Sequence, residues 1–208
     1  LLSARNMDQV LVVERSNKSV VMRLGTDGDH DTLHEQHNPD WVVDADGNPT
    51  ILVADSENDR VVEYARENGT WNRTWELTGN LSWPRDADRL PNGNTLVTDT
   101  LHHRVIEVTP RGEVVWEYRA PWAPYDAERP AHGDGSNGPT AAAMNATGSY
   151  AVHGGADDGS TAREGVGEWL AGVGFESVGE RYAHVMPFVR PVWVPSWAWA
   201  QYVLGALL

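Results

Sequence analysis

The chain has 208 residues and a formal net charge of −14, from 30 acidic and 16 basic side chains. This charge argues against nucleic acid and anionic membrane surfaces as partners. Because there is no cysteine, disulfides, thiol catalysis and thiolate metal sites are excluded. Lys18 is the single lysine, which indicates a halophilic protein working in molar salt, where charges are screened over roughly 3 Å.

The chain opens with "LLSARNMDQVLVVERSNKSVVMRL", residues 1–24, in which Val10–Val13 and Val20–Val21 predict two short strands. This run begins inside a strand-like pattern and without an initiator Met, so we expect sequence upstream of it. Next, "LHEQHNPDWVV" at 33–43 places two histidines, a glutamate and an aspartate ahead of a predicted buried strand, Trp41–Val43.

Two regular copies of a β repeat follow, at residues 51–77 and 95–118. Each copy has an alternating strand, an Asp, a four-residue turn, an Arg, a second strand, and a third strand that carries a Trp. The Asp and Arg positions, Asp55 with Arg60 and Asp99 with Arg104, recur 44 residues apart. We expect each pair to bridge its turn.

A period in the low forties with three or four short strands is typical of a β-propeller blade. With residues 1–24 as a divergent first copy, the sequence predicts an all-β fold over 1–119, a partial propeller of about 2.5 blades. A propeller needs at least four blades to hide its strand edges. We therefore expect the remaining blades upstream in the full chain or on a partner chain.

Beyond residue 119 the composition changes. Residues 120–160 are rich in Pro, Gly, Ala and Asp and show no strand period, which predicts a linker. In 161–186 the apolar residues have helical spacing (Val166, Trp169, Leu170 and Val173), so an amphipathic helix is expected there. It either lies on a bilayer surface or packs against the propeller.

The last segment, 187–208, is apolar and rich in Trp. Pro195 predicts a helix start, and about 14 residues remain from there, against ~20 for a bilayer span. We interpret it as the start of a C-terminal membrane helix, with a buried strand or hairpin as the alternative. Five Asn-x-Ser/Thr sequons favour an extracytoplasmic, membrane-anchored location at the cell surface; they begin at Asn17, Asn68, Asn72, Asn80 and Asn145.

Two positions depart from the repeat. Arg5 falls where the regular copies have Asp, and Gln9 where they have Arg, in a turn that reads one residue shorter. Arg5 thus lacks the acidic partner that the repeat provides across the turn. It is expected either to be solvated or to point into the propeller channel and hold an anion. His37 matches Arg85 of "WPRDADRLPNGN", so it is either a turn histidine or part of a recurring cation-capable position that lines the channel.

The stretches "LLSARNMDQVLVVE", "HEQHNPDWV" and "RDADRLPNGNTLVTD" together resemble the arylsulfotransferase family over about residues 1–120. The resemblance implies a six-bladed propeller that moves sulfuryl groups between phenols without a nucleotide donor, a cofactor or a metal. Ser3-Ala4-Arg5 matches the family's sulfate-binding Ser-x-Arg, and Asn6 continues that motif. Gln36-His37 matches the Gln-His segment whose histidine becomes sulfated.

Two departures from the family pattern qualify this resemblance. The chain begins after the place of the family's upstream His-x-Asn element, and Arg85 stands where relatives carry a channel histidine. In place of that histidine, Arg85 is expected to add positive charge and bind substrate. The resemblance also implies Asn6 as a substrate-binding residue, beside His37 and Arg5. The small-molecule partners implied are an aryl sulfate donor and a phenol acceptor.

The implied chemistry needs a neutral imidazole at His37 that attacks sulfur while a phenolate leaves. Arg5 would offset charge on the sulfuryl oxygens. Either Glu35 or Asp40 is expected to hold the His37 tautomer, and the sequence does not choose between them. The alternative function is a non-catalytic cell-surface propeller that binds a protein or glycan, since this fold hosts many functions.

The other histidines are expected to play no part. His30 and His34 are predicted to be solvated loop residues, and His102 and His103 to be exposed at a hairpin tip. A zinc site from His30, His34 and His37 is disfavoured because their spacing has no helical period. Acidic, Gly-containing runs at 25–31 and 44–48 do not complete a calcium loop, so no metal site is predicted.

Overall fold

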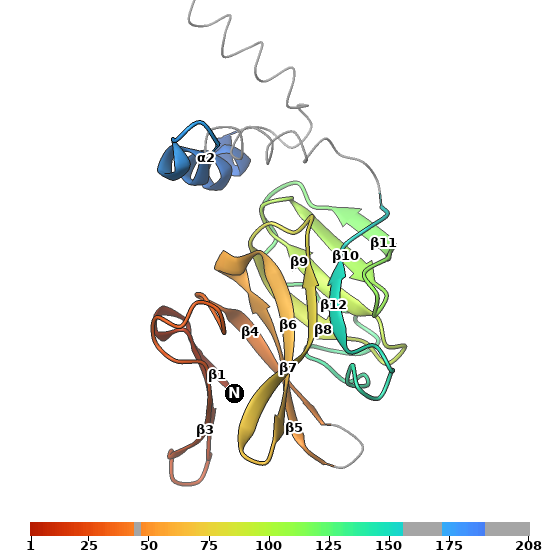
Figure 1. The fold of residues 1–208 in the computed structure, drawn as a ribbon. Coiled ribbons are helices and arrows are strands. Elements are labelled where there is room, and N and C mark those ends of the chain that lie inside the picture. Colours follow the sequence, from red (N-terminus) through yellow and green to blue (C-terminus); the bar gives the residue numbers. More distant parts are fainter. Residues whose placement is uncertain (44–46, 156–171, 190–208) are drawn as a thin grey trace, which may run out of the picture.

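The computed structural model describes residues 1–43, 47–155 and 172–189 (Figure 1). In this part three β-sheets follow one another along the chain, and within each sheet consecutive strands pair antiparallel. The first sheet contains β1 (Leu2–Ala4), β2 (Gln9–Val13) and β3 (Val20–Leu24). The second contains β4 (His37–Val43), β5 (Pro49–Asp55), β6 (Arg60–Glu67) and β7 (Thr70–Thr78). The third contains β8 (Pro84–Arg89), β9 (Thr95–Asp99), β10 (Arg104–Val108) and β11 (Val114–Arg119).

A four-stranded meander in chain order is the blade unit of β-propellers, and the second and third sheets both have it. The predicted all-β character of residues 1–119 is confirmed. The segments 61–64 and 105–108 lie in strands β6 and β10. Among the described residues up to 119, the other elements are two 3-10 turns, η1 (Arg5–Met7) and η2 (Ser56–Asn58).

The predicted salt bridges across equivalent turns are also confirmed. Asp55 closes β5 and accepts from Arg60 Nε at 2.7 Å, and Asp99 closes β9 and accepts from Arg104 Nε at 2.7 Å. Both carboxylates are fully buried. A buried carboxylate needs such a partner, because removing it from water without one is costly.

The first copy of the repeat is aligned one residue differently from the sequence-based expectation. Ala4 pairs with Gln9 exactly where Asp55 pairs with Arg60, so Ala4 takes the place of the repeat's Asp. Arg5 instead takes the place of Ser56, the first residue of the 3-10 turn, and the two turns have equal length. The expectation was wrong because the short strand β1 has no alternating pattern that sets its register.

Neighbouring sheets are joined by a repeated hydrogen bond. Asp8 and Asp59 end the 3-10 turns in the left-handed region, with φ of 51° and 49°, which Asp tolerates better than most residues. Asp8 Oδ1 accepts the Glu35 N–H at 2.9 Å, and Asp59 Oδ1 accepts the Trp83 N–H at 2.6 Å. Each aspartate therefore fixes the chain just before the first strand of the next sheet.

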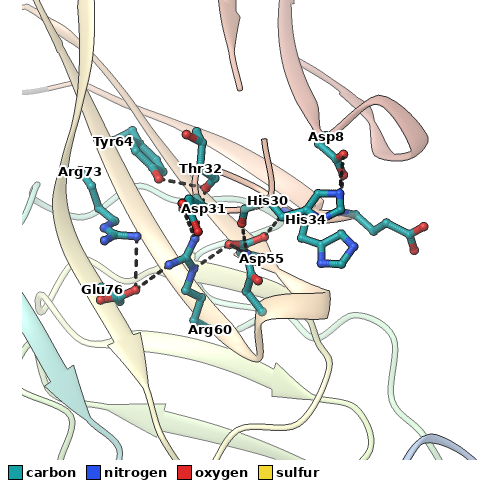
Figure 2. Close-up of polar contacts among 12 residues, drawn as sticks. Asp8, His30, Asp31, Thr32, His34, Asp55, Arg60, Tyr64, Arg73 and Glu76 are labelled. Carbon is teal, nitrogen blue, oxygen red and sulfur yellow. Dashed lines mark hydrogen bonds and ion pairs between the residues drawn. The ribbon is translucent and has the colours of Figure 1, made fainter. Parts of the chain in front are cut away.

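Arg60 strengthens the joint between the first two sheets (Figure 2). Its Nη2 donates to the Asp31 carbonyl at 2.7 Å, and its Nη1 donates to Glu76 at 2.9 Å. Tyr64 adds a hydrogen bond from its hydroxyl to the Thr32 carbonyl at 2.9 Å. The segment that leads to His37 is thus held by the Arg60 and Tyr64 side chains of β6.

Apolar side chains fill the spaces between sheets. One cluster, which includes Val10, Leu24 and Ile51, lies between the first and second sheets. A larger one, which includes Leu52, Val97 and Ile106, lies between the second and third. Trp75 is fully buried in it and donates Nε1–H to the Pro110 carbonyl at 2.8 Å.

The segment predicted as a linker contributes structure to the second sheet. Within 120–160, β12 (Gly148–Ala151) pairs parallel with β7 at the outer edge of that sheet, and the Val152 N–H donates to the Thr78 carbonyl at 2.9 Å. The linker expectation is corrected here because an edge strand is recruited through backbone groups. Its mostly exposed side chains need no apolar alternation.

The helix α2 spans Glu176–Val189, so it overlaps the predicted helical range 161–186 only in its second part and continues past it. The residues that motivated that prediction lie mostly outside the described ranges, as does the segment from 190 onward. Among the described residues, no helix has the length and apolar character that a bilayer crossing requires.

Candidate functional site

Four polar residues meet where the turns η1 and η2 approach the beginnings of β4 and β8. His37 opens β4, Ser56 opens η2, Arg85 lies in β8 and Arg5 opens η1. His37 Nδ1 is 2.9 Å from Ser56 Oγ, and His37 Nε2 is 2.5 Å from Arg85 Nη1. The site is therefore assembled from all three sheets.

The equivalence predicted between His37 and Arg85 agrees with the register of the regular part of β4 and β8, but not with the pairing at His37 itself. Asp40 pairs with Leu52, and Asp88 pairs with Leu96, so β4 and β8 match with an offset of 48 residues. The same offset relates His37 to Arg85, but His37 precedes a bulge in β4 and pairs with Ala54, whose counterpart Thr98 pairs with Asp86. His37 and Arg85 thus lie near the starts of β4 and β8, and the imidazole of one is in contact with the guanidinium of the other.

The hydrogen bonds of His37 define its tautomer. Arg85 has only donors, so the Nε2 atom that it contacts must be the acceptor and Nδ1 must carry the proton. Nδ1–H then donates to Ser56 Oγ, and that hydroxyl donates to the Pro84 carbonyl at 2.7 Å. Arg85 and the Ser56 hydroxyl together hold the tautomer, in place of the Glu35 or Asp40 side chain that was expected from sequence.

The surroundings keep His37 uncharged. Its side chain is buried, with 7% of the residue exposed. Burial, together with the positive charges of Arg85 and Arg5, lowers the pKa of His37 to about 4. At neutral pH the imidazole is therefore a neutral group with its Nε2 lone pair directed at a guanidinium.

Arg5 has an acidic partner, contrary to the sequence-based expectation. Its guanidinium forms an ion pair with Glu35 and lies 4.0 Å from Glu57. Asn6 is exposed, and its Oδ1 accepts from Arg5 Nη1 at 2.9 Å. The expectation failed because Glu35 is 30 residues away in sequence and meets Arg5 only through the packing of the first two sheets.

Aromatic rings enclose Arg85. Its guanidinium carbon lies 3.5 Å from the centroid of the Trp83 ring and 5.2 Å from that of Tyr125, distances at which cation–π attraction acts. Trp83 Nε1–H donates in turn to Glu57 at 2.7 Å. Tyr125 also places the edge of its ring at His37, with centroids 6.0 Å apart.

Three carboxyl groups lie farther along β4 and β8. Burial raises the pKa of Asp40. Burial, and then the nearby Asp86 and Asp40, raises the pKa of Asp88 to about 9. Burial and Asp126 raise the pKa of Asp86 to about 7. The carboxyl of Asp88 is thus protonated at neutral pH and shares a hydrogen bond with Asp40.

The four histidines predicted to lie in a loop and at a hairpin tip form two pairs. His30 and His34 stack with ring centroids 3.8 Å apart, and His30 Nε2 is 3.4 Å from Asp8 (Figure 2). His102 and His103 are buried, so their predicted exposure was wrong. His102 Nδ1 lies 2.8 Å from the buried Asp99 carboxylate, which the hairpin pattern does not reveal. Within the described ranges, no cluster of three or more His or acidic residues has a metal-binding arrangement.

Sequence reasoning missed Ser56, Glu57, Trp83 and Tyr125. A signal existed for the first of these, because Arg5, Ser56 and Thr100 all open the turn after a repeat strand. When the three copies are aligned at this position, two have a hydroxyl residue and the first has Arg5. Tyr125 lies outside the repeat, so no periodicity could place it at His37.

The chain matches no protein-family model and no curated protein. Among solved structures it is similar to virginiamycin B lyase from Staphylococcus aureus, at 14% identity and a TM-score of 0.37, over 56% of this chain. It is also similar to the periplasmic gluconolactonase of Pseudomonas aeruginosa, at 16% identity and a TM-score of 0.41, over 59% of this chain. The match spans 36% of each of these proteins.

Proposed function

We propose that the complete protein transfers a sulfuryl group from an aryl sulfate to a phenolic acceptor through a sulfated His37. The observation that carries the proposal is the neutral imidazole, whose Nδ1 binds Ser56 while Nε2 faces Arg85. An unprotonated nitrogen held in one orientation can attack sulfur while the aryl phenolate leaves, which divides a difficult transfer into two easier steps.

In this proposal Arg85 is the main anion-binding group. When the donor enters, its guanidinium moves from Nε2 to the sulfuryl oxygens and leaves the nitrogen lone pair free to attack. Charge-assisted hydrogen bonds of this kind contribute about 1.5–3 kcal/mol each. Trp83 stacks on the guanidinium and thereby limits how far it moves.

Arg5 adds a second positive charge near His37. A guanidinium has five N–H donors, so Arg5 can keep its ion pair with Glu35 and still bind a sulfuryl oxygen. Asn6, which accepts from Arg5 Nη1, then orients the arginine and acts on substrate indirectly. The Glu35 and Glu57 carboxylates prevent an excess of positive charge while the site is empty.

The proposal extends to the rest of the molecule. The site would be completed by further propeller blades upstream in the full chain, because a partial propeller leaves strand edges open. The protein would act outside the cytoplasm, anchored by the segment after Pro195, which lies outside the described residues. Four of the five sequon asparagines are exposed (Asn17, Asn68, Asn72 and Asn145), as glycosylation requires.

Turnover of a chromogenic aryl sulfate by the complete protein, with and without added phenol, tests the proposal. His37→Ala should abolish transfer, whereas the matched variant His34→Ala, on the same segment, should retain it. Arg5→Lys keeps the charge but loses the planar fork, so activity should fall sharply without vanishing. Mass spectrometry of protein quenched during turnover should find the sulfuryl group on His37.

Three results would count against the proposal. Transfer to added phenol with no sulfated His37 peptide in the quenched protein, or an active His37→Ala protein, would remove the assignment of His37. An inactive protein with all its blades present would favour the alternative, a non-catalytic cell-surface propeller that binds a protein or glycan.

A further inference from the structure

A tyrosine lies at the candidate site on a segment outside the β repeat. This segment, residues 120–127, leaves the end of β11 and is attached at both of its ends. The Ala120 N–H donates to the His103 carbonyl at 2.8 Å, and the Ala127 N–H donates to Asp86 Oδ2 at 3.4 Å. Between these attachments Tyr125 remains 55% exposed, so its phenol is accessible.

The phenol ring of Tyr125 contacts both reactive partners of the proposed site. The His37 and Tyr125 rings meet edge to face at a centroid distance of 6.0 Å. The Arg85 guanidinium carbon is 5.2 Å from the Tyr125 ring. Burial lowers the pKa of Arg85, and the nearby Tyr125 hydroxyl acts in the opposite direction. One guanidinium therefore lies next to both His37 Nε2 and a phenolic oxygen.

This placement matches what the second half of the proposed reaction needs. An acceptor must present a phenol oxygen to the sulfur on Nε2 while a cation binds the sulfuryl oxygens. A tethered phenol has a large effective concentration over a free one, since its translational and rotational entropy is already lost. The first acceptor that a sulfated His37 meets is thus the tyrosine of its own chain.

We infer that Tyr125 is a self-modification site, a phenol that accepts the sulfuryl group from His37 when no external acceptor is bound. The inference rests on the proposed function, because it uses the same sulfated histidine. It adds a tyrosine O-sulfate to the chain, at a position where the Arg85 guanidinium pairs with the new anion.

The two steps balance. In the first, the Nε2–S bond forms and the S–O bond to the aryl group breaks, so a phenolate leaves. In the second, the Tyr125 oxygen forms a bond to sulfur, the S–Nε2 bond breaks, and its electron pair returns to Nε2. The proton lost by Tyr125 balances the proton that the released phenolate takes up. No oxidant, reductant or further reactant is needed.

The experiment uses the complete protein with 4-nitrophenyl sulfate and no added phenol. Wild type should release a burst of about two equivalents of 4-nitrophenol per chain, one for His37 and one for Tyr125, and Tyr125→Phe about one. Peptide mapping should find one SO₃ group on Tyr125. His37→Ala should abolish that label, because the sulfuryl group reaches Tyr125 only through the histidine.

Tyr118 is the matched control, because it is 53% exposed and lies in β11, a few residues earlier. It should stay unlabelled, and Tyr118→Phe should give the wild-type burst. Equal labelling of Tyr118 would overturn the inference. So would a sulfated His37 that serves added phenol while Tyr125 stays unmodified, a result that leaves the proposed function intact. If no phenol is released and no residue is sulfated, both are overturned.

Discussion

At the scale of single residues, the reactivity of His37 depends on groups that its own segment does not contain. Ser56 lies 19 residues away, and Arg85 lies 48 residues away. Ser56 accepts the hydrogen bond from Nδ1–H, and Arg85 faces the unprotonated Nε2. Neighbours in space, brought together by sheet packing, thus decide whether this histidine is a nucleophile or a structural side chain.

Ser56→Ala should weaken the preference of His37 for the Nδ1–H tautomer. Without the hydroxyl, both His37 Nδ1–H and the Pro84 carbonyl lose a buried partner, which costs about 1–3 kcal/mol of stability for each unsatisfied group. The Nε2–H form should become populated to the extent that the Arg85 guanidinium, which has only donors, moves away from Nε2. The ring ¹⁵N chemical shifts of His37 report the change, and transfer activity should fall with the fraction of the Nδ1–H form.

Thr100→Ala provides the control for that variant. Thr100 occupies the equivalent turn position in the third sheet, and its buried hydroxyl has no hydrogen-bond partner. Its removal should leave the His37 shifts unchanged and cost little stability. Identical His37 shifts in wild type and Ser56→Ala would contradict the role given to Ser56.

The charge of Arg85 should be measurable in the titration of His37. Burial and Arg85 hold the pKa of His37 at about 4. Arg85→Met removes the positive charge and keeps most of the bulk, so the pKa of His37 should rise toward the ordinary value of about 6.5. NMR titration of the imidazole tests this shift. An unchanged titration would mean that burial alone depresses the pKa.

At the scale of elements, a buried ion pair fastens the segment after β11 to the second and third sheets. Arg89 of β8 is fully buried, and its Nη2 is 3.2 Å from Glu63 of β6. The Glu63 carboxylate also accepts the Ala141 N–H at 3.0 Å and the Thr74 hydroxyl at 2.9 Å. Residues near 141 are therefore structural, although their composition is that of a linker.

Arg89→Met should destabilise the protein by about 3–5 kcal/mol, because it leaves the Glu63 carboxylate buried without a cation. Adding Glu63→Gln should recover part of that loss. Arg73→Met is the control, since the Arg73 side chain is 39% exposed in its pair with Glu76, and solvent-exposed pairs contribute about 0–1 kcal/mol. Urea unfolding measures the loss, and hydrogen exchange at the Ala141 amide localises it. Equal losses for Arg89→Met and Arg73→Met would contradict this role.

At the scale of the whole molecule, stability should depend on pH through buried carboxyls. The pKa of Asp88 is raised to about 9 and that of Asp86 to about 7, whereas an unfolded Asp has a pKa of about 3.9. The folded state therefore holds protons that the unfolded chain has released. Its stability falls as pH rises through that range, by at most about 1.4 kcal/mol per pH unit for each proton.

Histidine 37 contributes in the opposite direction and in a different window. Its folded pKa of about 4 lies below the unfolded value of about 6.5. Above about pH 6.5 His37 is neutral in both the folded and the unfolded state, so it adds no pH dependence. Below that value the unfolded chain binds a proton first, and stability falls as pH falls toward 4. Between pH 7 and 9 the slope should come from the carboxyls.

Asp88→Asn should flatten the decline in stability between pH 7 and 9, because asparagine keeps the shape and a donor toward Asp40 but does not titrate. Urea unfolding of the complete protein at several pH values measures the slope. The exposed Asp27→Asn variant should reproduce the wild-type slope. A slope that persists unchanged in Asp88→Asn would show that other groups release the protons.

The sequence by itself determined the strand pattern and the Asp–Arg pairs across the turns. These features are local or repeated, so alternation and spacing encode them. Only the tertiary structure decided the partner of Arg5, the pairing of β12 and the approach of Tyr125 to His37. Each joins segments from different parts of the repeat, or from outside it. Such contacts depend on how sheets pack and on which backbone edge stays open, and no single segment carries that information.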